Sequence, residues 1–169
     1  IIRPKKEKKG KHRVKPGLNK NGGPMCMCLP RGNGLGIRLD DTLRPITIGT
    51  WEIILSGTDA AILTFGTSIP MALEAAEKLS GIGINVRVVN ARFIKPLDRA
   101  MLDELFDLEI PIMTVEEAVL AGGFGSAVLE YAHDPLYTAA RIHRMAIPGH
   151  FIEKGDVNKL LAELGVTAG

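Results

Sequence analysis

The sequence predicts an α/β domain of three layers, in which a five-stranded, mostly parallel sheet lies between two layers of helices. Short apolar runs typical of strands alternate with amphipathic stretches typical of helices, and short connections join them. The run at 60–65 is almost continuously apolar, which is the pattern of a strand buried on both faces. The first strand is expected to be antiparallel to the others.

The domain begins near Pro45, where the composition changes. Residues 46–55 predict one or two strands, and the Ser-Gly-Thr-Asp segment at 56–59 predicts a tight turn. Because tight turns join neighbouring antiparallel strands, we expect the first strand to pair with the strand at 60–65. Aromatic residues make up only 5% of the chain, so Ile, Leu, Val, Ala and Met are expected to form the core.

Residues 66–70 predict a strand-to-helix turn, with Thr67 or Ser68 as the helix cap. The helix that follows presents one apolar face, formed by Ala72, Ala75, Ala76 and Leu79. Glu74 and Lys78 are spaced to form an ion pair on its outer side.

The alternation continues to the end of the chain. Strands are expected at 84–89, 110–115 and 142–147. Helices are expected to open at Pro96-Leu97-Asp98, after the glycines of 122–126, and at Asp156, which caps the last one. Their inward faces carry Leu102, Leu105 and Phe106, then Ala127, Val128, Tyr131 and Ala132, then Val157, Leu160, Leu161 and Leu164.

Charge divides the chain into two parts. Residues 1–24 hold nine Lys or Arg and one Glu, whereas the rest holds 12 basic and 18 acidic residues, so the net charge of +2 describes neither. The basic part has few large aliphatic residues, and residues 1–29 are therefore expected to form a disordered arm. Its run at 5–13 could bind phosphates, but no aromatic residue is interleaved for base stacking. A solvated tail is favoured, and nucleic acid is not an expected partner.

Several classes of protein are disfavoured. Cys26 and Cys28 are the only cysteines, too few for a disulfide framework or a tetrahedral zinc site. No apolar run approaches the ~20 residues that span a bilayer, and the charged N-terminus does not read as a secretory signal. A cytoplasmic protein without membrane contact is expected.

Three turns at the carboxyl ends of strands are candidate ligand sites, because ligands of open α/β sheets bind there. They lie at 65–68, 116–125 and 148–153. The glycines of 122–125 could cradle a phosphate, but their spacing matches no nucleotide-binding motif, so close packing of helix on strand is favoured. His150 has no partner nearby in the sequence and is expected at the surface.

Charged residues near these turns do not assemble a catalytic set. Glu116 and Glu117 are adjacent and would point to opposite faces of a strand, so one of them is expected to be a structural hydrogen-bond acceptor. Arg92 and Lys95 could hold an anion, or could be solvated or paired with Asp98. The residues alone indicate no nucleophile with its base and no metal cluster.

Six motifs, in order, resemble a known family. They are Pro30-Arg31-Gly32-Asn33-Gly34, Phe65-Gly66-Thr67, Arg92-Phe93-Ile94-Lys95-Pro96-Leu97-Asp98, Thr114-Val115-Glu116-Glu117, Gly122-Gly123-Phe124-Gly125-Ser126, and Ile147-Pro148 with His150-Phe151-Ile152-Glu153-Lys154-Gly155-Asp156. From about Pro30 to Gly165 the chain is similar to the C-terminal part of the 1-deoxy-D-xylulose-5-phosphate synthases, most closely to bacterial ones. These are transketolase-like enzymes that depend on thiamine diphosphate.

The resemblance implies a transketolase-type C-terminal domain at 45–169. It implies that residues 30–44 are a linker and the end of a pyrimidine-binding domain, and that residues 1–29 are unlike the family. The family condenses pyruvate with glyceraldehyde 3-phosphate, with loss of carbon dioxide, for isoprenoid, thiamine and pyridoxal synthesis. Its enzymes are homodimers that use thiamine diphosphate and Mg²⁺.

Little of the family's site falls on this chain. Arg31 matches an arginine that contacts the substrate phosphate in the family, a contact that suits a guanidinium group. The segment that binds the diphosphate and the glutamate that activates the cofactor have no counterpart here. The resemblance therefore implies a fragment that holds no cofactor or metal and is inactive alone.

Four residues depart from the family pattern, and two alternative functions are also considered. Cys28, Leu29, Gly149 and Lys154 stand where the family has other residues. One alternative is the C-terminal domain of a 2-oxoacid dehydrogenase β subunit, which has the same fold. The other is a non-enzymatic interaction module with a basic arm that binds nucleic acid.

Overall fold

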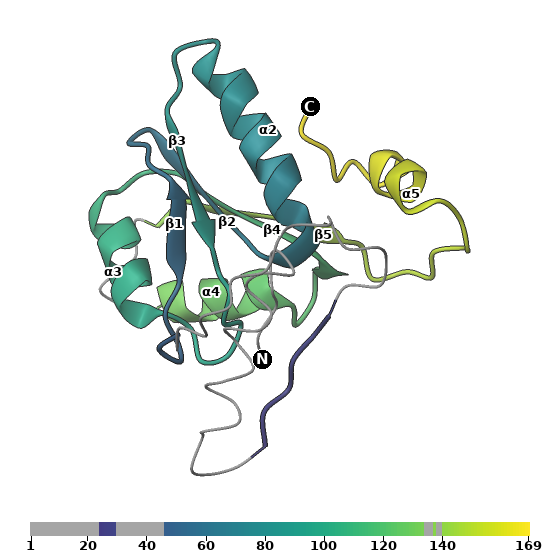
Figure 1. The fold of residues 1–169 in the computed structure, drawn as a ribbon, viewed down its shortest axis with the longest axis horizontal. Coiled ribbons are helices and arrows are strands. Elements are labelled where there is room, and N and C mark those ends of the chain that lie inside the picture. The colour runs from purple at the N-terminus through teal and green to yellow at the C-terminus, as the bar shows by residue number, and fades with distance from the viewer. Residues whose placement is uncertain (1–23, 30–45, 134–136, 138–139) are drawn as a thin grey trace, which may run out of the picture.

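The computed structural model describes residues 24–29, 46–133, 137 and 140–169. Strands and helices alternate as the sequence predicts (Figure 1). The elements are β1 (Glu52–Leu55), β2 (Ala60–Thr64), a 3₁₀ turn η1 (Gly66–Ser68), α2 (Ile69–Ser80), β3 (Val86–Asn90), α3 (Arg99–Asp107), β4 (Ile112–Val119), α4 (Phe124–Ala132), β5 (Ile142–Ile147) and α5 (Val157–Glu163). The expected conformation of residues 1–29 falls mostly outside the described part, as does the linker at 30–44.

The sheet has five strands in the order β1-β3-β2-β4-β5. Strands β2, β3, β4 and β5 are parallel, and β1 is antiparallel to its neighbour. The central strand is β2, whose last four residues are all buried, as its apolar run predicts. The predicted fold class is therefore confirmed.

The predicted partner of the first strand is wrong. Strand β1 pairs with β3, not with β2. The connection from β1 to β2 crosses the start of β3, where the amides of Thr58 and Asp59 both donate to the carbonyl oxygen of Asn85 at 3.0 Å. Burial decides the arrangement: β2 is apolar enough to lie between two parallel strands, whereas β1 alternates between half-buried and exposed residues and suits an edge.

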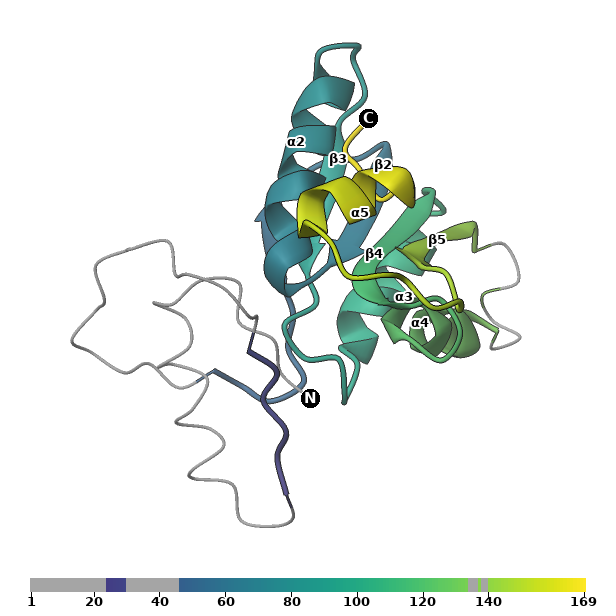
Figure 2. The ribbon, with the colours of Figure 1, turned by 90° about the vertical axis from the view of Figure 1, so that its right-hand side faces the viewer.

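Helices cover the two faces of the sheet unequally (Figures 1 and 2). Helix α2 packs on one face through Ala72 and Ala76, against Ile62, Val86 and Val88 of the strands. Helices α3 and α4 pack on the other face and form the larger core with Leu63, Val89 and Ile112. The three predicted layers are present.

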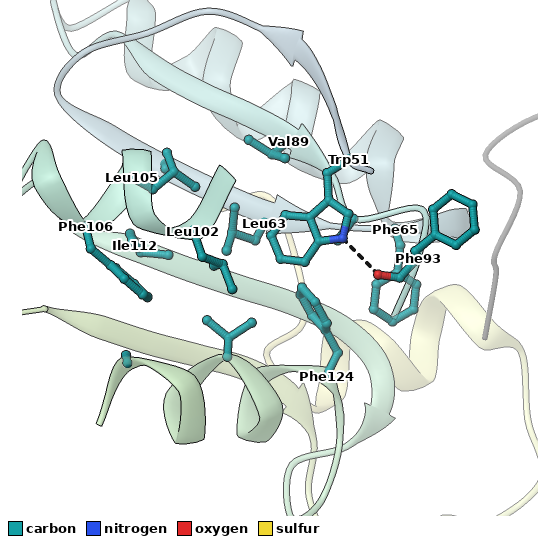
Figure 3. Close-up of a cluster of buried hydrophobic side chains, with 14 residues drawn as sticks. Trp51, Leu63, Phe65, Val89, Phe93, Leu102, Leu105, Phe106, Ile112 and Phe124 are labelled. Carbon is teal, nitrogen blue, oxygen red and sulfur yellow. Dashed lines mark hydrogen bonds between the residues drawn. The ribbon is translucent and has the colours of Figure 1, made fainter. Parts of the chain in front are cut away.

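Aromatic side chains contribute more to the larger core than the composition suggests. Trp51 and Phe65 each make an edge-to-face contact with Phe124, with ring centroids 5.6 and 5.3 Å apart. The indole nitrogen of Trp51 donates a hydrogen bond of 2.8 Å to the carbonyl oxygen of Phe93 (Figure 3). Aliphatic residues still form most of this core, as expected, but the few aromatic residues are concentrated in it.

Aspartate side chains cap two of the predicted helices, including the predicted cap Asp156. The carboxylate of Asp98 accepts the amide of Met101 at 3.1 Å, and that of Asp156 accepts the amide of Lys159 at 3.1 Å. Ser68 occupies the cap position of α2, but its side chain makes no capping hydrogen bond. Its hydroxyl is buried and has no hydrogen-bond partner among the described residues.

A tyrosine pair fastens the segment after α4 to α3. The hydroxyls of Tyr131 and Tyr137 donate to the same oxygen of Asp103, at 2.6 and 2.8 Å. The hydrogen bond to Asp103 is the main cause that raises the pKa of Tyr137 to about 12. The folded chain holds this proton more tightly than the unfolded chain. The hydrogen bond therefore stabilises the fold at pH values below the ordinary tyrosine pKa of about 10.

Stability is therefore expected to fall as the pH rises from about 10 towards 12. Tyr137→Phe removes this contribution, so the difference in denaturation midpoint between the two proteins should be largest at pH 8 and shrink above pH 10. Urea unfolding of both proteins at pH 8 and pH 11 measures it. A difference that grows with pH would contradict the assignment.

In the described residues, none of the helices has the length and apolar character needed to span a membrane.

Candidate functional site

The carboxyl ends of the parallel strands meet at one edge of the sheet, which we call the carboxyl edge. Strand β2 leads through α2 to β3 on one side, whereas β4 lies on its other side. The chain thus adds strands first on one side of β2 and then on the other. Open α/β sheets bind ligands in the crevice between the two strands where this change occurs, here β2 and β4. The predicted turns at 65–68 and 116–125 flank this position.

Glu116 is the structural hydrogen-bond acceptor that was predicted for one of the two adjacent glutamates. It is only 1% exposed, and its two carboxylate oxygens accept the amides of Phe124 and Gly125, each at 2.8 Å. Glu117 lies on the opposite face and lines a pocket beside α2. Both the opposite orientation and the structural role are confirmed, although β4 extends four residues beyond the predicted end at Val115.

The glycines beside Glu116 are required by close packing. A Cβ atom on Gly123 would lie 2.6 and 2.7 Å from the Glu116 carboxylate oxygens and 2.5 Å from the carbonyl oxygen of Val119. A Cβ atom on Gly125 would lie 2.4 Å from the hydroxyl of Thr114. Packing of helix on strand therefore explains these glycines, as favoured above.

The same geometry argues against a phosphate at this turn. The N-terminus of a helix attracts anions through its free amides and its dipole. At α4 those amides already bind Glu116. The chain's own carboxylate thus occupies the place that a phosphate would take.

Side-chain hydrogen bonds fix the rest of this turn. The hydroxyl of Ser126 accepts the amide of Gly122 at 3.0 Å and donates to the carbonyl oxygen of Leu120 at 2.9 Å. Arg144 of β5 donates to both the Ser126 hydroxyl and the Leu120 carbonyl, at 2.8 and 3.1 Å. The turn is therefore held by β5 as well as by β4.

Arg92 follows β3 and is held by the segment before β1. Its Nε donates to the carbonyl oxygen of Thr50 at 2.6 Å, and Nη2 donates to the Thr50 hydroxyl at 2.7 Å. Burial lowers the pKa of Arg92, and the charges of Glu52 and Asp98 oppose that shift. The carboxylate of Asp98 instead accepts the amides of Trp51 and Met101, at 2.6 and 3.1 Å.

A pocket of about 990 Å³ opens at the carboxyl end of β2, between α2 and α5. Gly66, Thr67 and Ser68 form part of its wall, with Glu117 of β4 and Val157 of α5. Glu74 and Lys78 also line it and form the predicted ion pair, at 3.0 Å. The turn at 65–68 is one of the predicted candidate sites, so part of this wall was expected. The pocket itself was not predicted, because α5 forms another part of its wall and no local motif shows where a terminal helix packs.

The sequence analysis also singles out His150 and Arg31. His150 is exposed, as expected. Arg31 lies outside the described residues, so its role remains a prediction.

The described residues do not fit a magnesium ion or a diphosphate group. Within 24–29, 46–133, 137 and 140–169, no three His, Cys, Asp or Glu side chains gather as a metal site would require. The glycine-rich turn that might have held phosphates is filled by Glu116.

Residues 49–169 match the family described as Transketolase, C-terminal domain. The chain belongs to this family. The transketolase C-terminal domain also resembles a solved structure described as a split gene transketolase, an inactive β4 tetramer, with a TM-score of 0.84 and 26% identity. The match covers 99% of this chain and 53% of that one. A transketolase from Leishmania mexicana shares the fold, with a TM-score of 0.68 and 18% identity over 99% of this chain and 23% of that one.

Curated relatives are 1-deoxy-D-xylulose-5-phosphate synthases. That of Geobacillus thermodenitrificans is 58% identical over 168 residues, and that of Bacillus licheniformis is 56% identical over 167 residues. Each match takes in 99% of this chain, but the chain spans only about a quarter of the relatives' length (27% and 26%). Because the alignments extend through residues 1–29, the view that resemblance ends upstream of Pro30 does not hold.

Proposed function

We propose that this transketolase C-terminal domain is part of a bacterial, cytoplasmic 1-deoxy-D-xylulose-5-phosphate synthase. The reaction joins the two-carbon unit left when pyruvate loses carbon dioxide to glyceraldehyde 3-phosphate, for isoprenoid, thiamine and pyridoxal synthesis. The observation that carries the proposal is 58% identity to such a synthase over 168 residues.

Thiamine diphosphate and Mg²⁺ belong, in this proposal, to the part of the synthase that precedes the domain. The cofactor supplies the stabilised carbanion of the reaction. This chain's own residues provide a rigid carboxyl edge, with Glu116 fixing the turn before α4 and Arg144 fixing it from β5. Arg31 would contact the substrate phosphate, and the complete enzyme would be a homodimer.

The alternatives receive less support. Identity of 53–58% to several synthases favours a synthase over a 2-oxoacid dehydrogenase β subunit. It also disfavours a separate interaction module, because residues 1–29 align with these enzymes together with the rest of the chain.

A chimeric enzyme tests the proposal. In the chimera, this chain replaces the aligned 168-residue stretch of the Geobacillus thermodenitrificans synthase. It should form 1-deoxy-D-xylulose 5-phosphate from pyruvate and glyceraldehyde 3-phosphate within about tenfold of the parent rate, a difference in barrier of about 1.4 kcal/mol. Product is measured by chromatography.

The parent enzyme and a version that lacks the aligned stretch are the two controls. A chimera that folds and assembles like the parent but forms no product would contradict the proposal.

A further inference from the structure

A second pocket lies where the parallel strands begin, at what we call the amino edge of the sheet. Its volume is about 410 Å³, within the range of pockets that hold small molecules. It is lined by the first residues of three neighbouring strands, Ala60 of β2, Ile112 of β4 and Ile142 of β5, and by Leu79 near the end of α2. The amino-edge pocket is therefore at the opposite end of the strands from the carboxyl edge.

One wall of the amino-edge pocket is a row of side chains that crosses three strands. Ile62 of β2 is paired with Met113 of β4, which is paired with His143 of β5. Paired residues on neighbouring strands point to the same face of a sheet, so these side chains lie side by side on the face that carries α2. Ile62 is buried in the smaller core and Met113 packs against it, whereas His143 is exposed. The row thus leads from the core to an imidazole at the surface.

The pocket is open because α2 covers only part of this face. Helix α2 packs mainly on β3 and β2, whereas β5 lies two strands beyond β2, at the edge of the sheet (Figure 2). Leu79 and Val86 line the pocket on the α2 side, and none of the residues of α5 lines it. Apolar side chains in the opening therefore face water, which favours a ligand with an apolar part that covers them.

The polar side chains of the pocket are both basic. Among the described residues that line it, Arg141 and His143 carry polar groups, and none is an Asp or a Glu. Nη2 of Arg141 donates to the carbonyl oxygen of Glu109 at 3.0 Å, which leaves further donors on the guanidinium fork. The carboxylate of Asp59, just before β2, accepts the amide of Asn85 at 2.6 Å. The opening of the pocket therefore fits an anionic group.

We propose that the amino-edge pocket binds a small anionic amphiphile, a molecule with a short hydrocarbon chain that ends in a carboxylate or phosphate. The chain lies on Ile62 and Met113, and the head group accepts hydrogen bonds from Arg141 and His143. A guanidinium fork binds carboxylates and phosphates alike. The site goes beyond the proposed function, since it uses none of the residues of the carboxyl edge.

A titration of the isotope-labelled 169-residue chain with octanoate, followed by nuclear magnetic resonance, tests the site. The amides of Ile62, Met113 and His143 should shift saturably, with a Kd of about 1 mM or below, as a ligand of this size allows. Octanol keeps the chain without the charge and should bind at least about fivefold more weakly, because hydrogen bonds to charged groups are stronger. Acetate has the charge without the chain and should give no saturable shift. Octyl phosphate is titrated in parallel, and the tighter of the two anions identifies the head group.

Arg141→Glu reverses the charge of an exposed residue at the opening of the pocket. It should weaken octanoate binding at least about tenfold and leave octanol binding unchanged. Lys159→Glu is the matched control, because it makes the same change in net charge on α5, which does not line this pocket. Its affinity for octanoate should equal that of the wild type.

Three results would overturn the proposal. Octanoate shifts that do not saturate, or that spread to exposed apolar residues elsewhere such as Ile82 and Phe151, would show non-specific contact. Equal binding of octanol and octanoate, unchanged by Arg141→Glu, would show that the basic side chains have no part in binding. Shifts of the same amides with protein concentration, without any ligand, would make a second copy of the chain the occupant.

Discussion

Replacing Glu116 with glutamine is expected to lower the free energy of unfolding by about 3 kcal/mol, the scale of a buried hydrogen bond to a charged group. The carboxylate accepts two backbone amides, those of Phe124 and Gly125. A glutamine offers one acceptor oxygen and one NH₂ group, so one amide faces a donor instead of an acceptor. Gly123 packs so closely on this side chain that it has little room to turn.

Urea unfolding followed by the fluorescence of Trp51, the only tryptophan, measures the loss. Glu117→Gln is the matched control: the same change at the next residue, where the carboxylate lines the open pocket. It should change stability by less than about 0.5 kcal/mol. Equal losses for the two variants would show that Glu116 does not hold the turn.

Gly57→Ala is expected to cost about 3 kcal/mol or more, the upper range for overpacking. A Cβ atom there would lie 2.3 Å from the carbonyl carbon of Val86, 2.5 Å from the amide nitrogen of Arg87 and 2.6 Å from the carbonyl oxygen of Asn85. All three are backbone atoms, so no side chain can move aside. The connection between β1 and β2 would have to leave the start of β3.

Gly149→Ala is the control for this change, because a Cβ atom at Gly149 would meet nothing within 4 Å. Its denaturation midpoint should remain within error of the wild type. A Gly57→Ala protein as stable as Gly149→Ala would contradict the described crossing of the β1–β2 connection over β3.

The sequence predicts the fold well where one local pattern determines the structure. The apolar run at 60–65 identifies the central strand, and Asp98 and Asp156 identify helix starts because a capping side chain acts within one helical turn. The strand pairing of β1 was not predictable in the same way. Its partner depends on which strand must be buried between two others, which involves residues far apart in the chain.

The same distinction between local patterns and long-range packing applies to the candidate site. Adjacent glutamates on a strand must point to opposite faces, so a structural role for one of them followed from the sequence. That Glu116 fills the N-terminus of α4 did not follow, because the contact joins two elements eight residues apart through a turn of unknown shape. The pocket between α2 and α5 depends on long-range packing alone.

Calorimetric titration with thiamine diphosphate and Mg²⁺ tests most directly the claim that this domain works beside a cofactor held elsewhere. The chimera should give saturable binding, and the 169-residue chain should give none up to about millimolar cofactor, the limit at which binding becomes very weak. Saturable micromolar binding by the 169-residue chain would contradict the claim.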